Sequence, residues 1–120
     1  MPEFSKIDFI KAVQSSANLK TEFNTWTDAL NSMKTEIDKI DFDVAILGCG
    51  AYAMPLGSYI KEKGKIAIIM AGATQLLFGI KGNRWDAQEK YQKLYNENWV
   101  KPNKNETPKE NKVVEGGSYW

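Results

Sequence analysis

The stretch Asp43-Val44-Ala45-Ile46-Leu47-Gly48-Cys49-Gly50-Ala51-Tyr52-Ala53-Met54-Pro55 decides the fold class of this 120-residue chain. Its continuous apolar part, residues 44–47, predicts a strand that is covered on both faces. The Gly48-Cys49-Gly50 turn that follows, with Pro55 soon after it, is typical of a passage from a strand into a helix. Such a turn presents backbone N–H groups to a phosphate, and the small Ala53 allows helix and strand to pack closely.

A second buried strand is predicted at residues 65–71, after a helix from Ala53 to Lys63 with Gly64 at its C-terminal cap. Two strands joined by a helix run parallel in one sheet. The expected fold class is therefore α/β, a Rossmann-like partial domain with a small parallel sheet and flanking helices. Two strands are fewer than such sheets usually have. Either N-terminal helices cover a very small sheet, or the chain is a C-terminal piece of a larger domain, or it pairs with a partner.

The segment before the first strand is predicted to be helical. Residues 5–18 carry an apolar stripe of Phe9, Ile10 and Val13. A second helix is expected over residues 25–40, because apolar residues recur there at alternating spacings of about four and three. These residues are Trp26, Leu30, Met33, Ile37 and Ile40. Trp26 is interpreted as a core residue and not as a ligand platform.

The remaining elements are expected to be short, apart from one helix. Residues 74–78 predict a short helix, and Asp86 with Glu89 forms a variant of the capping box, which predicts a helix from Asp86 to about residue 97. The polar residues 101–112 predict a loop or extended arm, followed by a short strand at Val113 and Val114. We expect Trp120 to dock against the body of the protein.

The domain organisation that follows has three parts. They are an N-terminal helical segment at 1–40, a Rossmann-like nucleotide-binding core at 41–100, and a C-terminal arm at 101–120 that packs on the core.

Composition excludes several function classes. The net charge of +1 does not indicate nucleic-acid binding. The absence of histidine excludes His-based catalytic triads and metal sites with histidine ligands. Cys49 is the single cysteine, so no internal disulfide can form, and we expect a cytoplasmic protein. The longest apolar or small run, 66–73, is far shorter than the about 20 residues that span a bilayer. We therefore expect no transmembrane segment, and any membrane contact to be peripheral, at the inner face.

Ligands of open α/β sheets bind beyond the carboxyl ends of the strands. The loops 48–52 and 71–75 follow the two predicted strands, and Lys81 and Arg84 come soon after them. Arg84 is the only arginine of the chain, and its planar fork suits a diphosphate. The predicted nucleotide- and phosphate-binding residues are Gly48, Gly50, Ala51, Tyr52, Gly72, Thr74, Gln75, Lys81 and Arg84. Catalytic residues stay unknown, and no metal-ligating residues are identified.

The residues at the end of the second predicted strand indicate which class of nucleotide would bind. An NAD site needs an acidic residue there to bind the ribose hydroxyls, and residues 68–72 contain none. A nucleoside diphosphate, as the carrier of an activated sugar, fits better. Tyr52 or Gln75 would then donate or accept hydrogen bonds at the base or the sugar, whereas Cys49 is interpreted as a small packed residue.

Four blocks resemble the C-terminal part of bacterial glycosyltransferases of the GT-D type, which assemble cell-surface polysaccharides and glycoproteins. The blocks are Leu47-Gly48-Cys49-Gly50-Ala51-Tyr52-Ala53-Met54-Pro55-Leu56, Gly64-Lys65, Gly72-Ala73-Thr74-Gln75-Leu76-Leu77-Phe78-Gly79-Ile80-Lys81-Gly82-Asn83-Arg84-Trp85 and Val114-Glu115-Gly116-Gly117-Ser118-Tyr119-Trp120. The resemblance covers most of residues 41–120. It implies a Rossmann-like fold and sugar transfer from a nucleotide-sugar donor of the UDP-sugar class, with Mg²⁺ or Mn²⁺.

The chain departs from that family in one respect. The family's acidic Asp-x-Glu metal motif lies upstream of the matching region, and no such segment is present here; Asp41-Phe42-Asp43 precedes the first strand, at the end remote from the expected crevice. We therefore expect either a glycosyltransferase or its C-terminal donor-binding portion, completed by an N-terminal half or a second copy. The alternatives are a non-catalytic nucleotide-binding or scaffold module and, less favoured, a small NAD(P)-binding protein.

Overall fold

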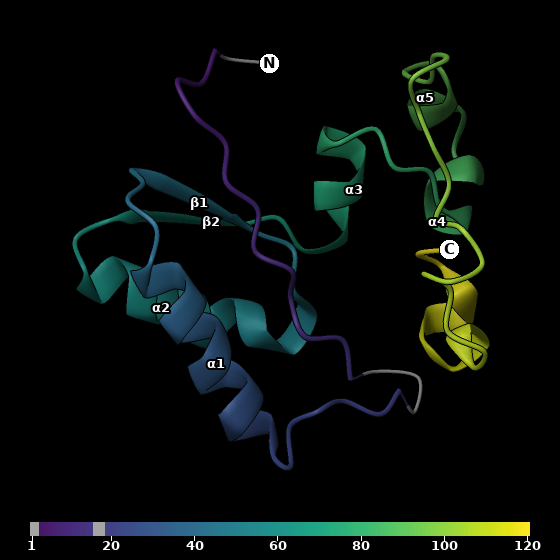
Figure 1. Cartoon of the computed structure of the whole chain (residues 1–120). Helices are drawn as coiled ribbons and strands as arrows, with labels where there is room; N and C mark the ends of the chain where they lie inside the picture. The colour runs from purple at the N-terminus through teal and green to yellow at the C-terminus, as the bar shows by residue number, and fades with distance from the viewer. Residues whose placement is uncertain (1–2, 16–18) are drawn as a thin grey trace.

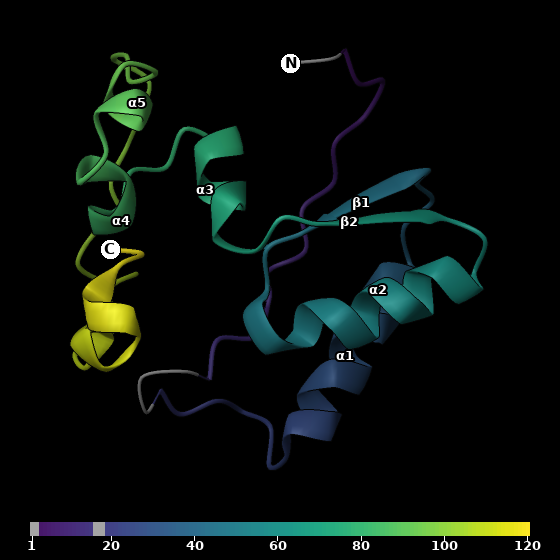
Figure 2. The same cartoon turned by 180° about the vertical axis from the view of Figure 1, so that it is seen from behind.

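The computed structural model describes residues 3–15 and 19–120, and it combines helices with a small parallel sheet (Figures 1 and 2). Its helices and strands are α1 (Trp26–Asp38), β1 (Val44–Leu47), α2 (Ala53–Glu62), β2 (Ile66–Ile69), α3 (Thr74–Leu77), α4 (Asn83–Asp86) and α5 (Glu89–Gln92). Short 3-10 turns lie at Gly50–Tyr52, Ala71–Ala73, Asn111–Val113 and Glu115–Gly117. The α/β class with flanking helices is confirmed at this level, and a Rossmann-like assignment stays a prediction.

Strands β1 and β2 pair in parallel and form a two-stranded sheet, as predicted. Val44 lies opposite Ile66, and Leu47 lies opposite Ile69. The connecting helix α2 ends in a left-handed glycine, Gly64, with φ of +75°. The N–H of Gly64 binds the carbonyl of Lys61, and that of Lys65 binds the carbonyl of Ile60, which closes the helix and turns the chain into β2.

Helices α1 and α2 cover one face of the sheet and build the main hydrophobic core (Figure 1). Helix α1 begins at a complete capping box between Thr25 and Asp28. Its buried residues pack with those of α2 and with Leu47. Helix α2 approaches the sheet most closely at Gly57, where a methyl group would lie 3.2 Å from Ile69 Cδ1. Glycine at this position therefore sets the spacing between the helix and the sheet.

The predictions that β1 is covered on both faces and that β2 is buried are wrong, and Val44 of β1 is itself 44% exposed. Ala45 and Ala67 pack against the core, whereas Ile66 is 58% and Ile68 46% exposed. Side chains alternate between the faces of a strand, so the exposed isoleucines belong to the face away from the two helices. The apolar run predicted burial on both faces of the strand, but the two longest helices, α1 and α2, both pack on one face of the sheet.

The helix predicted at residues 5–18 is wrong for residues 5–15, which run as an extended segment across the molecule (Figure 1). The rest of that prediction, residues 16–18, lies outside the described residues. Phe9 packs edge-on against Phe78, with ring centroids 5.9 Å apart, and Ala12 and Val13 pack against the core. These tertiary contacts take the place of the predicted helix, because a helix of this length is only marginally stable on its own and depends on packing.

Residues 83–120, which contain α4 and α5 and are here called the column, lie beside the sheet and are joined to it through α3 (Figures 1 and 2). The radius of gyration of 15.4 Å exceeds the about 13.6 Å expected for a compact domain of this length. The column has a buried residue of its own, Trp85, which is 6% exposed. Among the described residues, no helix is long and apolar enough to cross a membrane.

Two predictions for this column are wrong and two are confirmed. The continuous helix expected from Asp86 to residue 97 does not form: α4 already ends at Asp86, and the expected range contains only the short helix α5 and turns. The Asp86 carboxylate binds Tyr95 and Lys101 and caps no helix. Residues 111–113 form a 3-10 turn where the short strand was expected. Helix α3 forms as predicted. Trp120 docks as predicted, since its carbonyl accepts a hydrogen bond from the N–H of Asn83 in α4 at 3.3 Å.

Candidate functional site

The loops that follow the two strands lie side by side. The N–H of Met70 binds the carbonyl of Leu47 at 3.0 Å, which extends the parallel pairing to the carboxyl end of both strands. Gly48 then contacts Thr74 so closely that a methyl group on Gly48 would lie 2.5 Å from Thr74 Oγ1. Residues 48–52 and 71–75 therefore meet at one end of the sheet, where parallel sheets bind their ligands.

The first loop is a tight turn that leads into α2. Gly50 has φ of +56°, a left-handed conformation, and apart from its two chain neighbours no described residue has an atom within 4 Å of the position where its side chain would begin. Ala51 is exposed next to it. The first backbone N–H groups of a helix have no partner within the helix, so this turn offers donors and a partial positive charge to an anion.

Tyr52 and Cys49 of the first loop face inward. Tyr52 is 4% exposed and stacks on Trp26, with ring centroids 5.1 Å apart and an interplanar angle of 6°. Its hydroxyl lies 3.4 Å from Ser15 Oγ. Cys49 is half-buried, and burial raises the pKa of its thiol. The structure therefore places Tyr52 beneath α1 and keeps Cys49 protonated, as expected of a packed residue.

The side-chain hydroxyl of Thr74 is a buried polar group. Its hydroxyl is covered by the first loop and has no hydrogen-bond partner among the described residues. A buried hydroxyl without a partner costs about 1–3 kcal/mol, so such groups are rare and call for an explanation.

Gln75 and Arg84 are engaged by the C-terminal residues. The amide of Gln75 donates to the Tyr119 carbonyl at 2.9 Å and accepts from the Trp85 indole N–H at 3.0 Å. Arg84 lies beside the second loop, where its Nη1 would be 3.4 Å from a methyl group on Gly72. Gln75 thus bridges α3 to the column, and Arg84 is brought to the edge of the predicted site.

Lys81 belongs to a separate cluster around Asp86. Its ammonium lies 5.0 Å from the centre of the Tyr95 ring. The pKa of Asp86 is lowered, first by the hydrogen bond from Lys101 at 2.5 Å and then by that from Tyr95. Burial and the Asp86 carboxylate raise the pKa of Tyr95. This cluster joins α4 to the loop after α5. Lys81 thus lies over the Tyr95 ring, a contact that the sequence did not predict.

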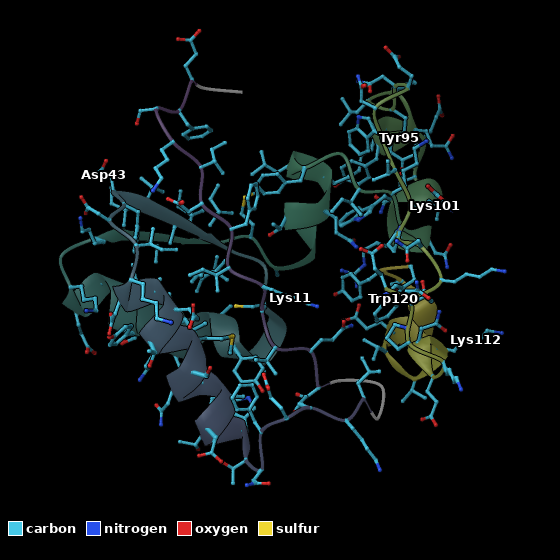
Figure 3. All side chains as sticks on the ribbon, in the orientation of Figure 1. Lys11, Asp43, Tyr95, Lys101, Lys112 and Trp120 are labelled. Atoms are coloured by element: carbon cyan, nitrogen blue, oxygen red, sulfur yellow. The ribbon has the colours of Figure 1, made fainter. Side chains whose placement is uncertain are left out.

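The implied Mg²⁺ or Mn²⁺ finds no donor set in the part of the chain that the structure describes. Nowhere in residues 3–15 and 19–120 do three or more Asp, Glu, Cys or His side chains gather to hold a metal ion. Asp43 lies at the end of the sheet away from Tyr95, Lys101 and Trp120 (Figure 3). The described residues therefore do not fit such a metal, and no chemical step is assigned to one.

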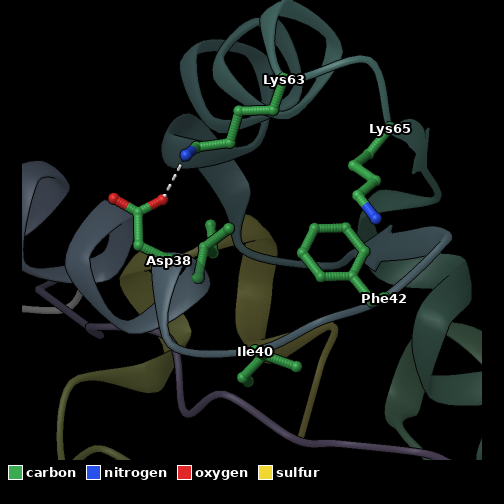
Figure 4. Close-up of a pocket in the computed structure, with 6 residues that line it drawn as sticks. Asp38, Ile40, Phe42, Lys63 and Lys65 are labelled. Atoms are coloured by element: carbon green, nitrogen blue, oxygen red, sulfur yellow. Dashed lines mark ion pairs between the residues drawn. The ribbon is translucent and has the colours of Figure 1, made fainter.

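Sequence reasoning missed a pocket at the opposite end of the sheet, with a volume of about 340 Å³ (Figure 4). Asp38 pairs with Lys63 at 2.7 Å, which lowers the pKa of Asp38 and raises that of Lys63. Lys65 pairs with Asp41 at 3.2 Å and lies over Phe42. These charges are balanced within the protein, so the pocket has no excess charge for an anion. The short spacing of the two lysines was the only signal for it in the sequence.

Comparison of the chain with protein-family models, curated proteins and solved structures gave no match. The resemblance to GT-D-type glycosyltransferases therefore stays a prediction.

Proposed function

We propose that this chain binds the nucleoside diphosphate of a UDP-sugar and is the donor-binding portion of a cytoplasmic glycosyltransferase in bacterial surface polysaccharide or glycoprotein assembly. The observation that carries the proposal is the contact of Gly48 with Thr74. It joins the two loops at the carboxyl ends of parallel strands, in front of the N-terminus of α2. The sugar donor and the assembly process are inferred from the resemblance of residues 41–120.

The binding role of each group follows from its chemistry. Backbone N–H groups at Gly50 and Ala51 would donate to phosphate oxygens, and the ten-residue helix α2 adds a favourable dipole. Arg84 would bind the diphosphate from the second loop, because its guanidinium donates two parallel hydrogen bonds to one phosphate. The hydroxyl of Thr74 has no hydrogen-bond partner among the described residues and packs against Gly48 of the first loop, so a small opening of the loops would let it donate to the ligand.

A second candidate is a non-catalytic nucleotide-binding or scaffold module. It is favoured by one observation, that no group of metal-ligating side chains forms within residues 3–15 and 19–120. The two candidates share the nucleotide site and differ in turnover. Metal-dependent release of UDP from a UDP-sugar would support the glycosyltransferase, and nucleotide binding without turnover would support the module.

The test is a calorimetric titration of the purified chain with UDP and UDP-glucose, with and without Mn²⁺. We expect Arg84→Ala to weaken UDP binding more than tenfold, since a charge-assisted hydrogen bond contributes about 1.5–3 kcal/mol. Lys104→Ala, which removes an exposed positive charge from the C-terminal arm, is the matched control and should bind UDP like the wild type. Equal affinity of the wild type and Arg84→Ala would remove Arg84 from the site. Tighter binding of NAD than of UDP would contradict the proposal.

A further inference from the structure

The C-terminal residues 115–120, here called the strap, pack against α4 and the second loop. The N–H of Arg84 donates to the Ser118 carbonyl at 2.9 Å, and the N–H of Asn83 donates to the Trp120 carbonyl at 3.3 Å. A methyl group on Gly72 would lie 2.6 Å from the Tyr119 ring. The strap therefore lies directly against the loop that follows β2.

The strap also places a carboxylate on the only arginine of the chain. Glu115 forms an ion pair with the Arg84 guanidinium. The guanidinium lies over the ring of Tyr119, 4.8 Å from its centre, and the Tyr119 hydroxyl donates to the other Glu115 oxygen at 3.3 Å. The side chains of Arg84 and Glu115 are 34% and 54% exposed, so solvent and a small anion can reach this pair.

The backbone of the strap is held in an uncommon conformation at this point. Glu115, Gly116 and Gly117 have φ of +47°, +67° and +81°, three consecutive residues in the left-handed region. The glycines adopt it freely, whereas glutamate does so at a cost. Residues held in such strained conformations cluster at ligand clamps and switch regions.

We propose that Glu115 is a built-in competitor of the phosphate, so that the strap holds the nucleotide site in a self-inhibited state. A guanidinium binds carboxylate and phosphate through the same pair of parallel hydrogen bonds, so one partner excludes the other from the same edge. The arriving diphosphate takes the place of Glu115 on Arg84, and the strap relaxes at residues 115–117. This inference rests on the proposed function, because it concerns the same site.

The experiment compares UDP affinities of the full chain by calorimetry. Glu115→Gln removes the competing charge with little change in shape, and Glu115→Asn also suits the left-handed backbone. Both variants should bind UDP about two- to fivefold more tightly than the wild type, the range expected for a partly exposed ion pair. Glu97→Gln removes an exposed carboxylate outside the strap and is the matched control for the change in net charge.

The outcomes separate the two proposals. Tighter binding by both Glu115 variants but not by Glu97→Gln supports competition by the strap. Unchanged or weaker binding by Glu115→Gln and Glu115→Asn, with weaker binding by Arg84→Ala, would overturn the competition and leave the nucleotide site in place. Failure of the wild type and of both Glu115 variants to bind UDP would overturn both. Equal tightening by Glu97→Gln would assign the effect to net charge and overturn the competition.

Discussion

Replacement of Gln75 by alanine tests how the column is attached to the sheet. The Gln75 amide joins the Tyr119 carbonyl to the buried indole N–H of Trp85. Gln75→Ala leaves the backbone of α3 intact and removes both hydrogen bonds. We therefore expect a loss of stability that a surface glutamine would not cause.

The magnitude follows from these two bonds. Each intramolecular hydrogen bond contributes about 0.5–1.5 kcal/mol, and leaving the indole N–H of Trp85 without a partner adds part of a desolvation penalty of about 1–3 kcal/mol. Trp85 is only 6% exposed, so water cannot readily replace the lost acceptor. The expected decrease in the free energy of unfolding is about 2–4 kcal/mol, a large share of the about 5–15 kcal/mol typical of a domain.

Urea denaturation followed by tryptophan fluorescence measures this decrease. Gln14→Ala, at an exposed position of the extended N-terminal segment, is the matched control and should change the free energy of unfolding by less than about 0.5 kcal/mol. In a Trp85→Phe background the donor is already gone, so Gln75→Ala should cost about 1 kcal/mol less than in the wild type. A decrease below about 0.5 kcal/mol in the wild type, or an equal cost in both backgrounds, would refute the bridge.

Three further predictions follow from the same structure. Thr74→Val should raise the free energy of unfolding by about 1 kcal/mol in urea denaturation, because it removes a buried hydroxyl that no described residue satisfies, and should weaken UDP binding in calorimetry; a loss of stability would mean that the hydroxyl has a hydrogen-bond partner. Deletion of Tyr119 and Trp120 should lower the melting temperature measured by circular dichroism, since their buried area stabilises the fold by a few kcal/mol (~2–3); an unchanged value would show a loosely attached terminus. Asp86→Asn should lower the free energy of unfolding at neutral pH by about 1 kcal/mol or less, through loss of the Lys101 pair. Folding lowers the pKa of Asp86, so the stability difference between wild type and Asp86→Asn should be complete above the unfolded pKa of about 3.9 and should vanish as pH falls through the folded pKa. An equal difference in the free energy of unfolding at pH 7 and at pH 2 would contradict this assignment.

The local signals of the sequence were sufficient for the strand–helix–strand unit. The apolar run 44–47 and the left-handed Gly64 depend on nearby residues alone, and the observed bounds of β1 agree with the prediction. The contact of Gly48 with Thr74 also follows, because parallel pairing brings the carboxyl ends of adjacent strands together. What lies beyond these ends depends on residues far away in the chain.

Long-range contacts explain what the sequence did not reveal. Phe9 packs against Phe78 in an extended segment, although its local spacing favours a helix. Asp86 begins a capping box by pattern, but Lys101 and Tyr95 bind its carboxylate from later in the chain. The engagement of Arg84 by Glu115 joins residues that are 31 positions apart, and no local pattern indicates it.

Mapping of backbone amide shifts by NMR during a UDP titration tests the central claim most directly, because it locates the nucleotide on the chain. We expect the largest shifts at residues 48–52 and 71–75, with a further shift at the N–H of Arg84, and little change around Asp38 and Lys63. Shifts confined to the Asp38–Lys63 pocket, or no shifts at millimolar UDP, would contradict a nucleotide site at the carboxyl ends of the strands.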